Sequence, residues 1–288
     1  MPKYSLLMKG ICSISIVPVR SDASDKAEIV TQLLFGELVE IIVIRKEWTY
    51  IRCEWDGYEG WCDTKQVQVL SDDHYYAYRL QHATCFELVQ PALSQEFFQP
   101  LTLGAVLPFY DGLSFSVAGS RYNFSGQTIP SATIKATSEL IVRIARKFLF
   151  APYLWGGRSP FGIDCSGLTQ VVYKMAGIRL LRDAAQQVTQ GRLVDFVEQA
   201  QAGDLAFFEN SIGRIAHVGI VLPGNKIIHA HGWVRIDTID HFGIFNEEKK
   251  VYTHNLRLVR RLLPDMETAE DFSPALVQTE QVRQIELF

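Results

Sequence analysis

The hydrophobic period of this 288-residue chain changes near Thr137, and this change separates two kinds of structure. Before it, β-branched and aromatic residues dominate short runs such as 38–44 and 48–53, with turn residues at 56–57. Such runs are typical of short antiparallel strands. After it, apolar residues recur at helical spacing, and apolar runs of strand length follow further on. We therefore expect small all-β units followed by a mixed α+β domain.

The all-β part is expected to form two small barrels. Residues 1–70 carry about five predicted strands, enough for one barrel. Residues 71–135 show a fainter version of the pattern, with strand and turn residues at 103–109 and 120–126, and predict a second, degenerate barrel. We interpret Asp72–Tyr78 as the connection between the two barrels.

The α+β domain is predicted over residues 136–263. The first helix follows Thr137 or Ser138 as N-cap, and a second helix over 165–175 ends near Gly177. Predicted strands then follow at 205–208, 215–222 and 226–231. Helices that precede a run of strands favour an α+β arrangement. Residues 264–288 are rich in acidic side chains, and we expect a surface tail there.

Charge and composition exclude several classes of protein. The chain has 28 basic and 32 acidic residues and a net charge of −4, which argues against a nucleic-acid partner. No apolar run reaches the roughly 18–20 residues that a membrane span needs. The apolar run 6–8 stops at Lys9 and is too short for a secretory signal, so we expect a cytoplasmic protein. We also expect a monomer. The five cysteines are irregularly spaced, which favours reduced thiols.

The residues around Cys165 predict a nucleophile. A glycine-rich loop at 156–162 precedes Asp164, which can cap the helix that follows and so places Cys165 in its first turn. Unpaired N–H groups there favour a thiolate. A nucleophilic thiol also needs a base, and His217 lies in an otherwise apolar predicted strand where a buried imidazole needs a partner.

A predicted hairpin supplies a third polar residue. If residues 223–225 form a three-residue loop, Leu222 pairs with Lys226, and His217, His229 and His231 share one face of the sheet. A second imidazole can then orient His217, as a carboxylate does in a serine triad. The register alone leaves open whether this imidazole belongs to His229 or to His231.

Five ordered motifs make the chain resemble the NlpC/P60 cysteine peptidases over about residues 137–262. These are Tyr153-Leu154-Trp155-Gly156-Gly157, Asp164-Cys165-Ser166-Gly167-Leu168, Gly203-Asp204-Leu205-Ala206-Phe207-Phe208, His217-Val218-Gly219-Ile220 and His229-Ala230. The resemblance implies a papain-like core with Cys165 as nucleophile and His217 as base. It implies that His229 is the orienting residue, and it implies no metal or cofactor.

Segments 28–37 and 56–61 resemble the first bacterial SH3-like domain of γ-D-glutamyl-L-diamino acid endopeptidases. This implies that both barrels are SH3-like, the second degenerate. It also implies a substrate, the free murein stem peptide L-Ala-γ-D-Glu-diamino acid, cut after D-Glu as in cell-wall recycling. Glu28 and Tyr58 are then candidates for binding the N-terminal amine, to which Asp164 is also available. The positions of Tyr153, Trp155 and Ser166 resemble residues that line the substrate.

The sequence departs from this pattern and leaves alternatives. Arg182-Asp183 is followed by Ala184-Ala185, where the enzymes it resembles often carry a Ser, and His231 replaces a small polar residue. A zinc site of Cys165, His217 and His229 is chemically conceivable. The alternative functions are a peptidoglycan- or peptide-binding protein that uses its barrels with little catalysis, and a related acyl transferase or amidase.

Overall fold

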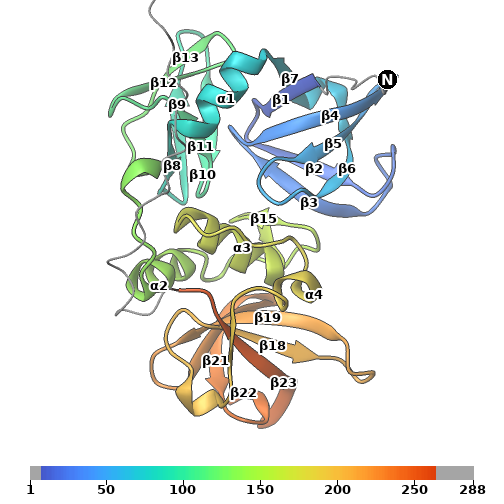
Figure 1. Cartoon of the computed structure of the whole chain (residues 1–288), viewed down its shortest axis with the longest axis vertical. Coiled ribbons are helices and arrows are strands. Elements are labelled where there is room, and N and C mark those ends of the chain that lie inside the picture. The colour runs from blue at the N-terminus through green and yellow to red at the C-terminus, as the bar shows by residue number, and fades with distance from the viewer. Residues whose placement is uncertain (1–7, 264–288) are drawn as a thin grey trace, which may run out of the picture.

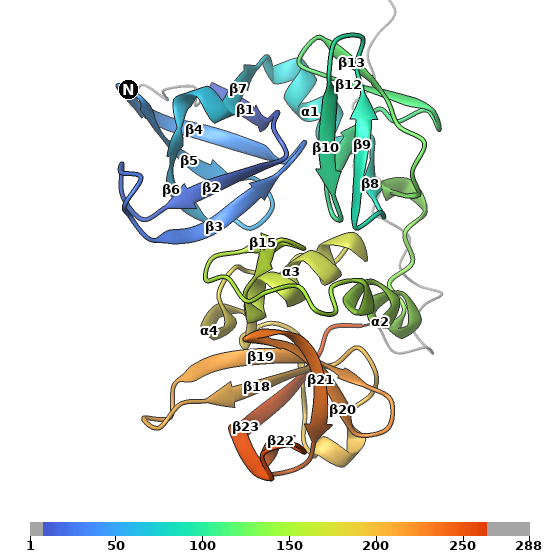
Figure 2. The same ribbon diagram turned by 180° about the vertical axis from the view of Figure 1, so that it is seen from behind.

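A computed structural model describes residues 8–263 of the chain, and the predicted acidic tail lies outside them. Two β units stand side by side at one end of the molecule, an antiparallel sheet forms the other end, and the longer helices lie between them (Figure 1). The view from behind shows the same order of layers (Figure 2). This arrangement confirms the predicted α+β fold with an all-β N-terminal region.

The N-terminal barrel is one seven-stranded antiparallel sheet in the order β3-β2-β6-β5-β4-β1-β7, richer in strands than the expected five. Its strands alternate buried and part-buried residues, and the buried set forms a core of its own. The strands are β1 (Met8–Cys12), β2 (Ile16–Arg20), β3 (Ile29–Leu34), β4 (Leu38–Arg45), β5 (Trp48–Cys53), β6 (Glu59–Asp63) and β7 (Val67–Leu70).

The second β unit begins with a helix where the sequence indicated only a connection. Helix α1 (Asp72–Leu80) starts at Ser71, whose side chain accepts from the His74 N–H, and acidic residues occupy its first turn. Sheets of four and three strands follow, in the orders β10-β9-β13-β12 and β11-β8-β14. The SH3-like assignment of this unit stays a prediction. Its strands are β8 (His82–Cys85), β9 (Val89–Leu93), β10 (Phe98–Thr102), β11 (Val106–Pro108), β12 (Ser114–Val117), β13 (Ser120–Asn123) and β14 (Thr128–Pro130).

The C-terminal domain starts with the predicted helices. Helix α2 (Ser138–Lys147) has Thr137 as its N-cap, and α3 (Cys165–Met175) follows Asp164. All residues of α3 are buried, because the helix lies between the β units and the C-terminal sheet. A short hairpin, β15 (Arg158–Ser159) and β16 (Gly162–Ile163), precedes α3, and α4 (Ala184–Gln187) follows it. No helix of residues 8–263 is long and apolar enough to cross a membrane.

The C-terminal sheet has the order β17-β23-β18-β19-β20-β21-β22, and β22 also pairs with β23, which closes the sheet into a barrel. Leu222 pairs with Lys226 and Ile220 with Ile228, which confirms the predicted hairpin register. The strands are β17 (Arg192–Val194), β18 (Leu205–Glu209), β19 (Ile215–Leu222), β20 (Lys226–His231), β21 (Trp233–Ile239), β22 (Gly243–Asn246) and β23 (Val251–Arg261).

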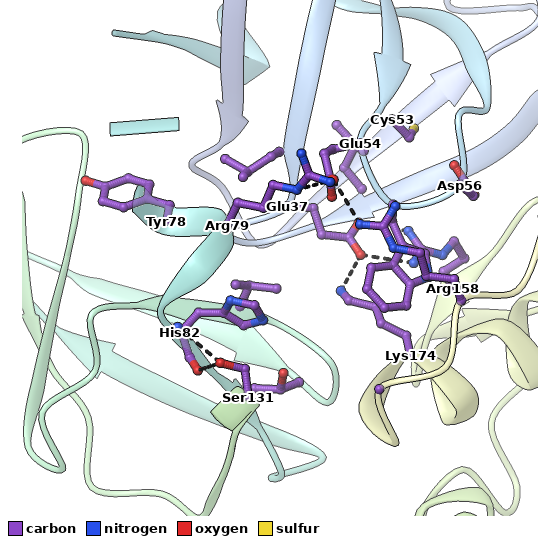
Figure 3. Close-up of a pocket in the computed structure, with 18 of the residues that line it drawn as sticks. Glu37, Cys53, Glu54, Asp56, Tyr78, Arg79, His82, Ser131, Arg158 and Lys174 are labelled. Atoms are coloured by element: carbon purple, nitrogen blue, oxygen red, sulfur yellow. Dashed lines mark hydrogen bonds and ion pairs between the residues drawn. The ribbon is translucent and has the colours of Figure 1, made fainter. Parts of the chain in front are cut away.

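A buried ionic cluster joins all three units beside a cavity of about 330 Å³ (Figure 3). Glu37 of the N-terminal barrel accepts hydrogen bonds from Arg158 at 2.8 and 3.0 Å and from Lys174 of α3. Lys174 Nζ also donates to the Gly104 carbonyl of the second β unit at 3.1 Å. All three charged side chains are at least nine-tenths buried. The relative positions of the three units are therefore held by charge pairing as well as by apolar contact.

Close backbone contacts complete the junction. Gly36 has φ +78°, and a Cβ there would lie 2.0 Å from the Val106 carbonyl oxygen of the second β unit. Gly156 has φ +76°, and a Cβ there would lie 2.2 Å from the Ile29 carbonyl oxygen of the N-terminal barrel. Only glycine fits both the dihedral angle and the space at these positions. The second contact brings the barrel against the loop that precedes Cys165.

Candidate active site

Cys165 is the first residue of α3, and the loop before it is held by Asp164. The Asp164 carboxylate accepts hydrogen bonds from the N–H of Gly167 at 2.6 Å and of Gly156 at 2.8 Å. Both of its oxygens also pair with the Arg182 guanidinium, at 3.1 and 2.7 Å. Arg182 is only 1% exposed. Asp164 is therefore the helix cap that the sequence predicts, and its ion pair fixes the position of the thiol.

The Cys165 thiol is held in its protonated form. Burial raises its pKa to about 12, and the negative charge of Asp164 acts in the same direction. Backbone hydrogen bonds at Val218 and Ser166 and the charge of Arg182 oppose the rise without overcoming it. The prediction that the helix N-terminus favours a thiolate is wrong for the free protein, because desolvation outweighs the helix terminus. A base must remove the proton before the thiol can attack.

His217 in β19 begins a relay of side chains. Its Nε2 lies 2.8 Å from His229 Nδ1, and His229 Nε2 lies 2.9 Å from an oxygen of Asp237 in β21. Arg235 donates to the other oxygen of Asp237 at 2.8 Å. His231, the alternative that the register left open, has its ring centre 6.4 Å from that of His217. The hydrogen-bonded partner of His217 is therefore His229.

Cys165 lies beside the strand that carries His217. Its sulfur is hydrogen-bonded to the backbone of Val218, the residue after His217. Because His217 Nε2 is bonded to His229, Nδ1 is the ring nitrogen left for the thiol. Burial lowers the pKa of His217 well below its ordinary value, and the neighbouring histidines add to this. The imidazole is neutral at pH 7 and can accept a proton.

A pocket of about 350 Å³ opens next to Cys165, and both the N-terminal barrel and the C-terminal domain contribute to it. Glu28 accepts a 2.5 Å hydrogen bond from Trp155 Nε1, and the Tyr58 hydroxyl donates to Asp183 at 3.3 Å. Burial raises the pKa of Asp183 and brings that of Tyr58 to about 12. Ala184 and Ala185, at the site of the missing serine, also line the pocket. Its polar groups are mostly carboxylates and hydroxyls, the groups that bind a cation.

The remaining predicted residues lie close by. Ser166 lines the same pocket and accepts a hydrogen bond from Arg182 at 2.9 Å. Tyr153 does not line it; its side chain borders a cleft of about 630 Å³ on the other side of Ala216, together with His217 and His231. Burial raises the pKa of Tyr153 to about 12, and the charge of Cys165 adds to the rise, so its phenol is near the sulfur.

Sequence reasoning missed three residues of this region. Asp183 was noted only as part of the segment before the missing serine, and the structure puts its carboxylate in the pocket. Asp237 lies two residues after Arg235, which pairs with His229, so the alternation of polar residues in β21 is the signal that could have found it. His254 comes from β23, and its ring stacks on His217 with 4.2 Å between ring centres. No local pattern in the sequence links His254 to His217.

Comparison with known proteins identifies related domains for the N-terminal barrel and for the C-terminal domain. Residues 151–257 match the NlpC/P60 family, and residues 19–67 match the bacterial dipeptidyl-peptidase SH3 domain. A γ-D-glutamyl-L-lysine dipeptidyl-peptidase of Bacillus subtilis is 33% identical over 69% of this chain and 71% of its own length. Dipeptidyl-peptidase 6 of Lysinibacillus sphaericus is 29% identical over 70% of this chain and 83% of its own length. The crystal structure of an NlpC/P60 family protein from Bacillus cereus superposes with a TM-score of 0.76 at 21% identity, covering 89% of this chain and all of that one.

The fold and these relatives define a peptidase with an α+β catalytic domain and an N-terminal SH3 domain. The chain belongs to the NlpC/P60 family, as its sequence motifs predict.

Proposed function

We propose that this peptidase hydrolyses the bond after γ-D-Glu in free murein peptides that begin with L-Ala and continue with a diamino acid. The observation that carries the proposal is the pocket beside Cys165, which contains Glu28, Tyr58, Asp164 and Asp183. Carboxylates beside the nucleophile attract a positively charged amine. In the proposed substrate that amine belongs to L-Ala and lies only two residues from the bond that is cut. The name of the Bacillus subtilis relative, a γ-D-glutamyl-L-lysine dipeptidyl-peptidase, supports cleavage after γ-D-Glu, and the name of the Lysinibacillus sphaericus relative supports release of a dipeptide.

The N-terminal ammonium of the substrate is bound by Glu28 and Asp183, and the Tyr58 hydroxyl adds a further contact. Burial raises the pKa of Asp183, so a cation that enters the pocket stabilises its charged form. Asp164 is already paired with Arg182 and contributes mainly by holding the loop. The barrel that carries Glu28 and Tyr58 closes this end of the site, so only the two residues L-Ala and D-Glu fit before the cleaved bond.

In the acylation step the Cys165 thiol gives its proton to His217 Nδ1, and the sulfur attacks the γ-carbonyl carbon of D-Glu. The N–H of Cys165 is one of the unpaired donors of the first turn of α3, and the Tyr153 phenol lies near the sulfur. These two donors stabilise the oxyanion. His217 then gives the proton to the leaving amine of the diamino acid, the C–N bond breaks, and a thioester remains.

In the deacylation step His217 takes a proton from water, and the hydroxide attacks the thioester carbonyl. The C–S bond breaks, L-Ala-D-Glu leaves, and the thiolate recovers its proton from His217. His229 keeps the His217 ring in the orientation and tautomer that these transfers need, and Asp237 does the same for His229. Cys165, His217 and His229 are thus the catalytic set.

The test is digestion of L-Ala-γ-D-Glu-diaminopimelate and of its lysine counterpart, followed by mass spectrometry. The wild-type protein should release L-Ala-D-Glu, and Cys165→Ala should release none. N-acetylation of the substrate removes the ammonium and should reduce kcat/KM by at least tenfold.

Glu28→Gln should cause a similar loss with the free-amine peptide, because one charge-assisted contact is removed. Glu59→Gln is the matched control, since Glu59 is on the same barrel but pairs with Arg52 outside the pocket. Equal cleavage of the acetylated peptide would discard the amine pocket and keep the peptidase. Binding of the peptides without any cleavage would favour the alternative of a peptide-binding protein.

A further inference from the structure

Four of the seven histidines of the chain gather at one place on the C-terminal sheet. His217 comes from β19, His229 and His231 from β20, and His254 from β23. The His254 ring stacks on His217, and its centre is 5.6 Å from that of His229 and 4.8 Å from that of His231. The proposed reaction uses two of these imidazoles and gives no task to His254.

The ring nitrogens are placed closely enough for one ion to reach three of them. One nitrogen from each of His217, His229 and His254 lies within 4.8 Å of the other two. In a tetrahedral zinc site with Zn–N bonds of 2.0–2.1 Å, ligand nitrogens are about 3.4 Å apart. His217 Nε2 and His229 Nδ1, now 2.8 Å apart, must separate slightly, and His254 must approach. The lone pairs of stacked rings do not point at one ion, so the His254 ring must also turn out of its stack on His217. Rotation of these side chains then completes three-nitrogen coordination.

Two of the three rings already have the outer contacts typical of metal-binding histidines. His229 Nε2 is bonded to the Asp237 carboxylate, which leaves Nδ1 as the coordinating nitrogen. His254 Nδ1 is 2.9 Å from the Thr253 hydroxyl, which leaves its Nε2. A carboxylate or hydroxyl on the far side of the ring fixes its orientation and raises its affinity for a metal. The Asp237 contact holds the His229 ring before any ion arrives, and the Thr253 contact determines which nitrogen His254 offers.

The cluster is open to solvent on one side. His217, His231 and His254 border the cleft of about 630 Å³, with Asn210 and Glu209 at its edge. An ion can enter here with its water ligands, and either water or His231 can take the fourth position. Imidazole suits Zn²⁺ and Cu²⁺ and suits Mg²⁺ or Ca²⁺ poorly, so the chemistry points to a borderline transition-metal ion.

We propose that Zn²⁺ binds His217, His229 and His254 and reversibly switches the peptidase off. The inhibition, unlike the binding itself, rests on the proposed role of His217 as the base. When Zn²⁺ takes the lone pair of His217 Nε2, the ring proton moves to Nδ1, the nitrogen that accepts the thiol proton in the proposed reaction. That nitrogen then cannot accept the Cys165 proton, and the hydrogen bond between His217 and His229 is lost. No proton is released, and no bond of the protein is broken.

The binding test uses Co²⁺ as a coloured substitute for Zn²⁺, in full-length Cys165→Ala so that the thiol cannot be a ligand. We expect a visible d–d absorption band that saturates at one Co²⁺ per chain and disappears when Zn²⁺ is added. His254→Phe in the same background keeps an aromatic ring on His217 but removes the ligand, and should weaken Co²⁺ binding at least tenfold. His74→Ala, on α1, is the matched control and should bind as before. Unchanged thermal unfolding would show that each variant is folded.

The activity test measures Zn²⁺ inhibition of the cysteine-containing protein and of His254→Phe, each against its own metal-free rate. We expect inhibition that EDTA reverses, and at least a tenfold higher half-inhibitory concentration for the variant. Equal inhibition of both would overturn the proposal, because it would assign the effect to a Cys165–His217 chelate. Absence of a Co²⁺ band, or an equal band in His254→Phe, would also overturn it. Binding without inhibition would overturn the switch, whereas failure of the metal-free protein to cleave peptide would count against the proposed function alone.

Discussion

Replacement of Glu37 by Gln should destabilise the whole molecule, because Glu37 is the buried anion between Arg158 and Lys174. The two cations lower the pKa of its carboxyl from 4.5 to about 2, against the opposing effect of burial. At about 1.4 kcal/mol per pKa unit, this corresponds to about 3 kcal/mol of folding free energy at pH 7. Glu37→Gln leaves both cations buried without a counter-charge, so the loss should be about 3–5 kcal/mol.

The sign of the pH dependence follows from the lowered pKa. The contribution of Glu37 is fully present above pH 4.5, the pKa of an unfolded Glu, and is lost as the pH falls toward 2. The difference in unfolding free energy between wild type and Glu37→Gln should therefore shrink between pH 5 and pH 3. Urea unfolding followed by tryptophan fluorescence at pH 7, 5 and 3 measures it.

Glu40→Gln provides the control for this experiment. Glu40 also bonds a lysine and an arginine, Lys9 and Arg52, but its side chain is 25% exposed. Such a pair should contribute at most about 1 kcal/mol. A Glu37→Gln protein within 1 kcal/mol of wild type at pH 7, or a difference that stays constant down to pH 3, would refute the reasoning about the buried cluster.

Three further predictions concern the site. The rate at which iodoacetamide alkylates Cys165 should increase steadily as the pH rises from 6 to 10, since burial raises the thiol pKa to about 12. A rate that is already maximal at pH 6 would indicate a preformed thiolate. Asp237→Asn should lower kcat about 10- to 100-fold with little change in KM, because the amide cannot hold the tautomer of the His229 ring that keeps His217 in place; an unchanged kcat would remove Asp237 from the relay. Gly156→Ala should raise KM for free-amine peptides at least tenfold, because its Cβ would meet the Ile29 carbonyl and move the barrel away from the site; steady-state kinetics with an unchanged KM would contradict this.

Local patterns predicted the parts of the site that neighbours in sequence determine. The loop at 223–225 fixed which residues of β19 and β20 pair, and hence that His217 and His229 share a face. Asp164 was predicted as a cap from the residue type and its position before a helical pattern. These features depend on a few adjacent residues, so the local sequence is enough to predict them.

The features that the sequence did not reveal depend on distant segments. Arg158 and Lys174 meet Glu37 from positions more than 120 residues away, and nothing near Glu37 in sequence indicates a counter-charge. The protonation state of Cys165 was predicted wrongly for the same reason. The helix terminus is visible in the sequence, but the burial that decides the pKa comes from the surrounding units. Tertiary burial therefore decides the chemistry that local pattern only suggests.

The pocket beside Cys165 is lined by residues of two units, and this has a consequence for the order in which the site forms during synthesis. A ribosome produces the barrel with Glu28 and Tyr58 before α3 and before the strands β19 and β20 that carry His217 and His229. A growing chain therefore carries Glu28 and Tyr58 before it carries His217, and a cut between the second β unit and α2 leaves Glu28 and Tyr58 on one fragment and Cys165 and His217 on the other. The complete pocket should therefore form in a single step, when the barrel docks on the finished C-terminal domain.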